Sequence, residues 1–253
     1  MSNAALLASS GLVLFTLLIS YWQHLKLEKE IFIGTVRAVV QLFVIGFVLK
    51  YIFDLNDWRF TLAMLFVMTV VASVNAAKRG KGIPRVLFIT TSAILAGASI
   101  TLAILITVQA IAFVPSETIP VAGMVIGNSM AATGLTLTRL RQAIEEKRWE
   151  IITSLSLGAT PRQAVVGSLQ KAIKMGMMPT IDSLKTMGIV QLPGMMTGLI
   201  LAGTNPVIAV RYQIMVVFMI SAAVSISCFV ASTLAYRSFF TAAYQLRTDL
   251  LTK

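Results

Sequence analysis

The stretch YQIMVVFMISAAVSISCFVASTLAY, Tyr212–Tyr236, contains no charged residue along 25 consecutive positions. As a helix it would be about 37 Å long, enough to cross the ~30 Å hydrocarbon core of a bilayer. The rest of the 253-residue chain has the same character: 57% of its residues are hydrophobic, 12% are charged, and the mean hydropathy is +0.85. Soluble domains of this size are less apolar. The sequence therefore predicts an all-α membrane protein.

Other apolar runs with few or no charges repeat this pattern along the chain. The seven predicted spans are Ala4–Tyr21, Gly34–Phe53, Phe60–Ala77, Val86–Phe113, Ile119–Leu137, Met187–Gly203 and Tyr212–Tyr236. We therefore predict a polytopic bundle that forms one transmembrane domain over residues 1–253. Residues 138–186 are the only long stretch that we expect outside the membrane.

The basic residues predict the orientation of these spans. Eighteen of the 21 Lys and Arg residues fall on one side of the predicted membrane, which the positive-inside rule assigns to the cytoplasm. Seven spans then place the N-terminus outside and the C-terminus in the cytoplasm. No Lys or Arg precedes the first span, so we expect a retained span rather than a cleaved signal peptide. The net charge of +11 is explained by cytoplasmic loops and does not require nucleic acid as a partner.

The predicted cytoplasmic segment, residues 138–186, contains a helix, a corner and a second helix. Apolar positions Ile144 to Leu155 share one helix face. Gly158 is placed to end that helix in the left-handed conformation. Thr160, Pro161 and Gln163 then have the pattern of a capping box that starts a new helix. Such a segment could lie on the bilayer surface or dock into a groove of a soluble partner.

Several sequence stretches resemble known permeases. The corner is similar to the coupling helix of ABC transporter permeases, which sits in a cleft of an ATP-binding subunit. IPVAGMVIGNSM (119–130), SLGATPRQA (156–164) and PTIDSLKTMGIVQLPGMMTGLILAG (179–203) resemble the FetB-type iron-export permeases, whose plant relatives are linked to aluminium tolerance. The similarity extends over nearly the whole chain. Importer permeases usually carry Glu-Ala-Ala before the coupling glycine, and this chain has Ile-Thr-Ser there, so importer behaviour does not follow.

The resemblance implies an iron exporter in the cytoplasmic (inner) membrane, built from two permease copies and a separate ATPase. The expected ATPase-docking residues are Glu150, Leu155, Leu157, Gly158, Ala159, Thr160 and Pro161. ATP and Mg²⁺ would be bound by the ATPase, and we expect no cofactor on this chain. The stretch RGKGIP (79–84) lacks the upstream glycine and the Ser or Thr of a phosphate-binding loop.

Two spans carry glycines at a spacing that favours close helix packing. The expected packing residues are Gly123, Gly127 and Gly134 in the fifth span and Gly194 and Gly198 in the sixth. These faces could pack within one chain, line the interface between two copies, or move against each other.

Thioether and oxygen donors near the glycines could form a path for a metal ion, although methionine more commonly fills gaps in a core. The candidate path residues are Glu28, Glu30, Met124, Asn128, Met130, Asp182, Met195 and Met196. Methionine favours Cu(I), whereas Fe(II) prefers oxygen and nitrogen. Arg37 and Gln41 share a face of the second span. Arg37 could reach the cytoplasmic surface or pair with a carboxylate at the cytoplasmic mouth.

Three classes of function fit these features to different degrees. We predict the membrane subunit of an ABC exporter, with iron implied by the resemblance alone. The alternatives are an ABC permease for another metal or small solute, or a secondary carrier that needs no ATPase. A carrier usually shows paired interrupted helices and a buried ionisable couple, which the sequence does not show. An intramembrane enzyme is disfavoured because the single histidine, His24, precedes the second span.

Overall fold

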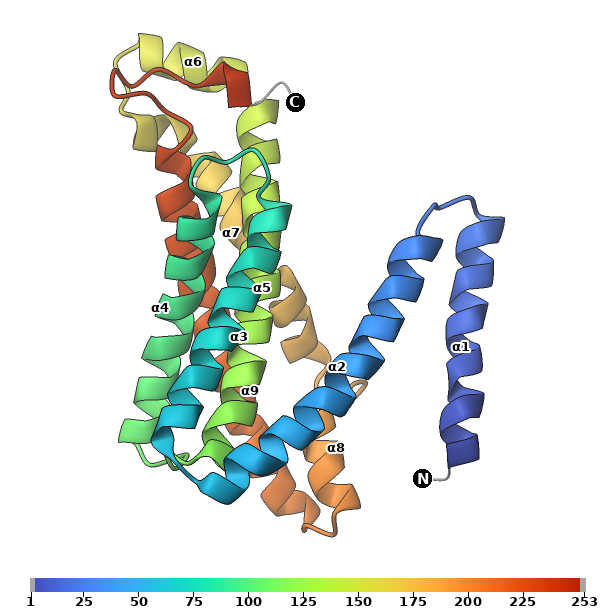
Figure 1. Ribbon diagram of the computed structural model, residues 1–253. Helices are drawn as coiled ribbons and strands as arrows, with labels where there is room; N and C mark the ends of the chain where they lie inside the picture. The colour runs from blue at the N-terminus through green and yellow to red at the C-terminus, as the bar shows by residue number, and fades with distance from the viewer. Residues whose placement is uncertain (1–2, 251–253) are drawn as a thin grey trace. The chain divides into compact units, whose positions relative to one another are not determined.

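The computed structural model describes residues 3–250, and it describes side chains from residue 11 onward except that of Asp249. Apart from two isolated bridges, all regular structure in this range is helical (Figure 1). The helices are α1 (Asn3–Trp22), α2 (Glu28–Leu55), α3 (Trp58–Arg79), α4 (Val86–Thr107), α5 (Pro115–Glu146), α6 (Arg148–Ser156), α7 (Pro161–Thr186), α8 (Gly194–Leu201), α9 (Pro206–Arg237) and a short 3₁₀ helix, Thr248–Leu250. The all-α fold class is confirmed.

The chain divides into two compact units between Asp57 and Trp58. The first unit is the pair α1 and α2. In the connection, the Ser20 hydroxyl donates to Glu28 Oε1 at 2.8 Å and accepts the Leu27 N–H at 3.3 Å. None of the most apolar part of α2 is buried within the protein. A 28-residue helix with this exposed apolar surface is typical of one that faces lipid.

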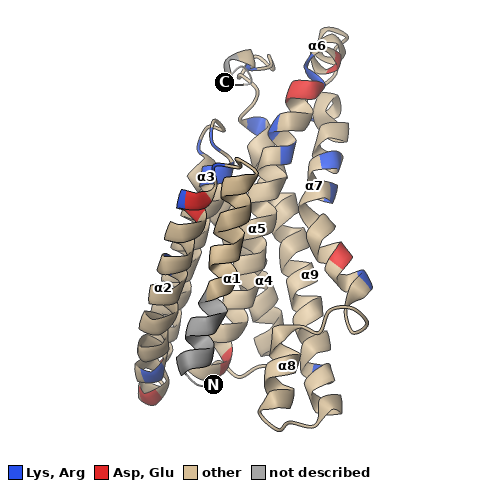
Figure 2. Ribbon diagram, turned by 90° about the vertical axis from the view of Figure 1, so that its right-hand side faces the viewer, with Lys and Arg blue, Asp and Glu red and all other residues tan. Residues whose placement is uncertain are grey.

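The second unit is a bundle of long helices. α3, α4, α5 and α9 pack side by side, and α7 packs against α5 and α9 (Figures 1 and 2). One apolar core is shared by α3, α4, α5 and α9 and contains Ile94, Val125 and Met219. A second core lies toward α6 and contains Leu140 and Phe239. Together, α2, α3, α4, α5 and α9 are long and apolar enough to span a bilayer.

Two glycines that sequence analysis did not single out allow the closest helix crossings. A Cβ atom on Gly97 of α4 would overlap the Ser227 side chain of α9 and would lie 2.7 Å from the Ala223 carbonyl oxygen. A Cβ atom on Gly176 of α7 would overlap the Thr136 side chain of α5. The bundle therefore depends on the absence of a side chain at both positions.

The predicted sixth span is not one helix, which corrects the sequence analysis. Its helical part is α8, eight residues long, or about 12 Å against the ~30 Å of the hydrocarbon core. α7 leads the chain from the α6 end of the bundle to about its middle, and α8 continues toward the opposite end (Figures 1 and 2). Residues 187–193 between them are not helical. We infer that the sixth crossing is made of two pieces joined by this break.

Three other boundaries differ from the sequence predictions. α4 ends at Thr107 rather than near Phe113. α5 begins at Pro115 and continues to Glu146, well beyond the predicted end at Leu137. The amphipathic helix predicted across residues 144–155 is divided by Lys147, so Ile144 lies on α5 while Ile151 lies on α6. Its apolar face is still buried, because both isoleucines belong to the same core.

The charged residues of the second unit are distributed unevenly. Lys and Arg gather at the end of the bundle that carries α6 (Figure 2). They come from the connection between α3 and α4, from the ends of α5 and α9, and from α6 and α7. Arg59 and Arg211 lie near the starts of α3 and α9, at the opposite end. The grouping matches the sequence analysis, and the assignment of the α6 end to the cytoplasm stays a prediction.

Candidate functional site

The corner between α6 and α7 is fixed by backbone hydrogen bonds. Gly158 has a φ of +90°, in the left-handed region that glycine adopts without strain. Its N–H donates to the Leu155 carbonyl at 3.0 Å, and the Ala159 N–H donates to the Ser154 carbonyl at 3.0 Å. These are the two bonds of a Schellman motif. The predicted left-handed helix end at Gly158 is confirmed.

The start of α7 is capped as the sequence predicts. The Gln163 N–H donates to Thr160 Oγ1 at 3.4 Å, and the Thr160 N–H donates to Gln163 Oε1 at 2.9 Å. Pro161 occupies the first helical position, where its missing N–H costs nothing. Both sides of the corner are therefore locally rigid.

The corner presents an apolar side chain outward while its base is anchored in the core. Leu157 at the corner is 84% exposed, and Trp149 at the opposite end of α6 is 72% exposed. On the inner side, Ile151 of α6 and Val165 of α7 are buried in the same cluster as Ile144. An exposed apolar tip on a rigid, anchored support is suited to insertion into a groove of another protein.

Polar contacts connect the corner to its neighbours. Lys171 of α7 forms an ion pair with Glu146 at the end of α5, with an N–O distance of 2.8 Å. Glu150 is paired with Lys147 at 2.7 Å. All four side chains are largely exposed, so each pair contributes modestly to stability.

Residues 238–250 contribute to the support of α6, which was not predicted from the sequence. Phe239 and Leu246 are buried in the core that holds α6, and a bridge joins Phe240 to Leu246. A hollow of about 640 Å³ lies between this segment and α6, lined by Leu155 and Gly158 among others. The aromatic pair Phe239–Phe240, directly after the last span, was the available signal.

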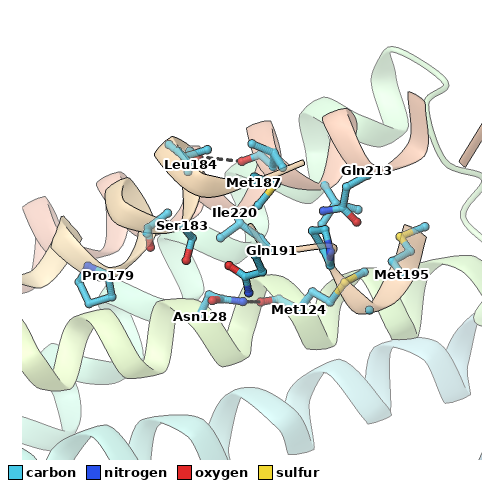
Figure 3. Close-up of a pocket in the computed structure, with 16 residues that line it drawn as sticks. Met124, Asn128, Pro179, Ser183, Leu184, Met187, Gln191, Met195, Gln213 and Ile220 are labelled. Atoms are coloured by element: carbon cyan, nitrogen blue, oxygen red, sulfur yellow. Dashed lines mark hydrogen bonds between the residues drawn. The ribbon is translucent and has the colours of Figure 1, made fainter. Parts of the chain in front are cut away.

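A second candidate site is a cavity of about 310 Å³ beside the break between α7 and α8 (Figure 3). α5, α7, α8, α9 and the 187–193 connection all contribute to its wall. The lining residues with polar or sulfur atoms are Met124, Asn128, Thr180, Ser183, Met187, Gln191, Met195, Gln213 and Ser221. This volume is at the lower end of the range for small-molecule sites. The cavity brings together three predicted path residues, Met124, Asn128 and Met195.

Gln213 is a buried polar group of the cavity that was not predicted from the sequence. Its side chain is only 6% exposed, and no described residue donates a hydrogen bond to its Oε1 atom. The available signal was its spacing, because Gln213 lies three and seven residues before the cavity residues Val216 and Ile220 on α9. A buried amide oxygen without a donor costs free energy unless a ligand or water satisfies it.

The other predicted path residues lie elsewhere. Met130 Sδ lies 3.4 Å from Asn75 Nδ2, which donates to it. Asp182 pairs with Lys185 at 3.1 Å on the exposed side of α7, well along α7 from the corner. Met196 and these residues do not line the cavity. In the first unit, Glu28 accepts the Ser20 hydroxyl, while Glu30, Arg37 and Gln41 are exposed on α2.

Comparisons with known proteins identify the family. The model of the uncharacterised protein family UPF0014 matches residues 3–240. The chain belongs to the UPF0014 family. It is 44% identical to "Probable iron export permease protein FetB" of Escherichia coli (strain K12), over 100% of this chain and 97% of the relative. It is 39% identical to "Protein ALUMINUM SENSITIVE 3" of Arabidopsis thaliana, over 96% and 89% of the two chains.

Another UPF0014 member aligns over nearly the whole chain. The chain is 42% identical to "UPF0014 membrane protein YjkA" of Bacillus subtilis (strain 168), over 94% of this chain and 95% of the relative. No solved structure matches the chain. The resemblance to FetB-type permeases and their plant relatives is confirmed, and the protein is a multi-pass membrane protein.

The five predicted packing glycines of this UPF0014 chain have different surroundings. A Cβ atom on Gly134 would lie 2.8 Å from Arg79 Cδ, and one on Gly123 would lie 3.2 Å from Met68 Cε. At Gly127, Gly194 and Gly198, no described atom lies within 4 Å of an added Cβ atom. For these three, packing against another helix or a second copy stays a prediction.

Proposed function

We propose that this chain is the membrane-spanning permease subunit of an ATP-driven exporter in the cytoplasmic (inner) membrane, and that iron is its cargo. The iron assignment is supported by the printed name of the Escherichia coli relative, which is 44% identical over the whole chain. The alignment covers 100% of this chain and 97% of the relative, which supports the same role for this chain, with the permease providing the transmembrane path.

The exposed corner between α6 and α7 is the observation that carries this proposal. Its tip offers the exposed Leu157 to a partner, and its base is fixed by Gly158, Thr160 and the buried Ile151. A movement imposed on the tip would pass into α5 and α7, because α6 packs on both helices. We therefore propose that an ABC-type ATPase subunit docks on residues 150–166 and supplies bound ATP and Mg²⁺.

By analogy with other ABC permeases, two copies of the chain would assemble with two ATPase subunits. ATP would close the ATPase dimer and bring the two corners together. The interrupted crossing formed by α7 and α8 would then be positioned to transmit this movement to the cavity, because α7 runs from the corner to the break.

A co-purification experiment tests the docking proposal. The Gly158→Pro variant cannot adopt the φ of +90° that the corner needs, so the ATPase subunit should no longer co-purify. The matched control is Gly167→Ala, since Gly167 lies on α7 with no described atom within 4 Å of an added Cβ. Undiminished association of a folded Gly158→Pro permease would refute docking at this corner.

One observation favours the ATPase-independent carrier as a second candidate. The break between α7 and α8 next to a polar cavity resembles the discontinuous helices that line carrier sites. Carriers usually place two such helices in related repeats, and the other long helices of residues 58–237 are continuous. Iron movement that is unaffected by ATP would favour this candidate.

A further inference from the structure

The basic end of the bundle (Figure 2) contains a hollow that the proposed function does not use. It has a volume of about 390 Å³ and lies between the first turn of α4, the last turn of α9 and the segment that follows α9. It shares no lining residue with the cavity beside the α7–α8 break or with the hollow beside α6. It is therefore a separate candidate for a ligand.

The wall of this hollow is positively charged. Arg85 precedes α4, Arg237 ends α9 and Arg247 comes from the following segment, whereas none of the described residues that line the hollow is Asp or Glu. Arg85 and Arg237 are exposed, and no described carboxylate forms an ion pair with either. Like charges on one hollow repel each other unless an anion lies among them. The wall therefore favours an anionic ligand.

The hollow becomes apolar toward the middle of the bundle. Phe88 lies three residues after Arg85, and Leu234 lies three residues before Arg237. Residues three apart share one face of a helix, so on both helices an apolar side chain lies about 4.5 Å deeper than the arginine. Phe88 is also 65% exposed. The hollow therefore offers charge at its outer end and apolar surface at its inner end.

The length of α4 indicates the depth of the hollow in a membrane. α4 has 22 residues and is about 33 Å long, so nearly all of it is needed to cross the ~30 Å hydrocarbon core. Phe88 in its first turn would lie at the edge of the hydrocarbon, where head groups meet acyl chains. A soluble protein or a free ion does not fill a site at this depth.

We propose that this hollow binds an anionic phospholipid of the cytoplasmic leaflet. The lipid phosphate lies among Arg85, Arg237 and Arg247, and an acyl chain lies along Phe88 and Leu234. The proposal goes beyond the proposed function, since it depends neither on an ATPase nor on the cargo.

The chemistry of arginine favours a lipid phosphate. A guanidinium group donates two parallel hydrogen bonds to phosphate oxygens. Basic pockets between transmembrane helices on the cytoplasmic side are typical sites for anionic head groups. A zwitterionic lipid carries an ammonium group next to its phosphate, which the same arginines repel. Inorganic phosphate would contact the arginines but leave the apolar wall unfilled.

Lipid binding to the full-length permease in detergent micelles tests the site. Native mass spectrometry would measure the binding of phosphatidylglycerol, which is anionic, and of phosphatidylcholine, which is zwitterionic. Arg85→Gln/Arg237→Gln should bind phosphatidylglycerol about 25-fold more weakly, or about fivefold for each arginine removed. Lys78→Gln/Arg139→Gln is the matched control, because it removes two exposed charges from the same end outside the hollow. It should change the affinity by less than about twofold, since salt screens distant charges.

A photocrosslinker tests the position of the lipid while all the arginines are kept. In micelles with equal amounts of both lipids, Phe88→benzoylphenylalanine should capture phosphatidylglycerol in preference to phosphatidylcholine. Phe66, which is 70% exposed near the middle of α3, is the control position. There, benzoylphenylalanine should capture both lipids equally.

Each contrary outcome overturns the lipid site. Unchanged phosphatidylglycerol binding in Arg85→Gln/Arg237→Gln, or equal capture of the two lipids at Phe88, would refute it. Arg85→Gln alone, in the connection before α4, provides the same test if the double variant does not fold. Displacement of the lipid by an equal concentration of inorganic phosphate would assign the arginines to a free ion. Loss of ATPase co-purification without any preference for phosphatidylglycerol would assign them to the ATPase.

The proposed function is tested separately. ATP-dependent iron export that persists in Arg85→Gln/Arg237→Gln while lipid binding is unchanged would refute the lipid site and leave the exporter intact. Arginine-dependent lipid binding without ATP-dependent export would support the lipid site and refute the exporter.

Discussion

Replacing Gly97 by alanine should weaken the crossing between α4 and α9. The new Cβ atom would overlap the Ser227 side chain, which can rotate away. It would also lie 2.7 Å from the Ala223 carbonyl oxygen, about 0.7 Å short of ordinary contact at 3.4 Å. A carbonyl within a helix cannot rotate, so the two helices must separate. Overpacking of this kind costs about 1–3 kcal/mol.

Helix propensity works in the opposite direction and must be measured separately. Alanine is favoured over glycine by up to ~1 kcal/mol within a helix. The control is Gly127→Ala, because no described atom lies within 4 Å of a Cβ atom there. Unfolding of both variants by sodium dodecyl sulfate in detergent micelles should show Gly97→Ala to be less stable than Gly127→Ala by about 1–3 kcal/mol. Equal stability of the two variants would show that the helices do not approach as closely as the structure indicates.

Two further predictions concern the corner. A membrane-impermeant maleimide should label a Leu157→Cys variant from the cytoplasmic side only and an Ala202→Cys variant, at the end of α8, from the opposite side. The native Cys228 is buried and should stay unlabelled. Labelling of both variants from one side would contradict the predicted orientation. Thr160→Ala removes the acceptor for the Gln163 N–H and should lower the stability of the first turn of α7 by about 1 kcal/mol. Amide hydrogen exchange at the start of α7 should then be roughly fivefold faster. Unchanged exchange would show that the cap does not hold the corner.

The features that sequence predicted well depend on local chemistry. The predicted starts of α4 and α7 are confirmed at Val86 and Pro161, because an uncharged run and a capping box act over neighbouring residues. The left-handed Gly158 is confirmed for the same reason, since the helix end is fixed by bonds within five residues.

The features that sequence missed depend on the packing of distant segments. The run Met187–Gly203 has no charged residue, so composition alone suggests one span, although Gly188 and Pro193 lie within the actual break. Gln213 is one amide within a long apolar run, and only the fold shows that it lines the same cavity as Ser183 of α7 and Gln191 of the 187–193 connection. No glycine or proline lies next to Lys147, so the sequence gives no signal for the division between α5 and α6 at this residue.

ATP-dependent iron movement is the most direct test of the account. Permease and its ATPase would be reconstituted in liposomes, and the movement of Fe(II) would be recorded with ATP, without ATP, and with the Gly158→Pro permease. The account predicts movement that requires ATP and is lost in Gly158→Pro, together with ATP hydrolysis that Fe(II) stimulates. Iron movement that proceeds equally without ATP, or is unchanged in Gly158→Pro, would contradict the claim that this chain is the permease subunit of an ATP-driven iron exporter.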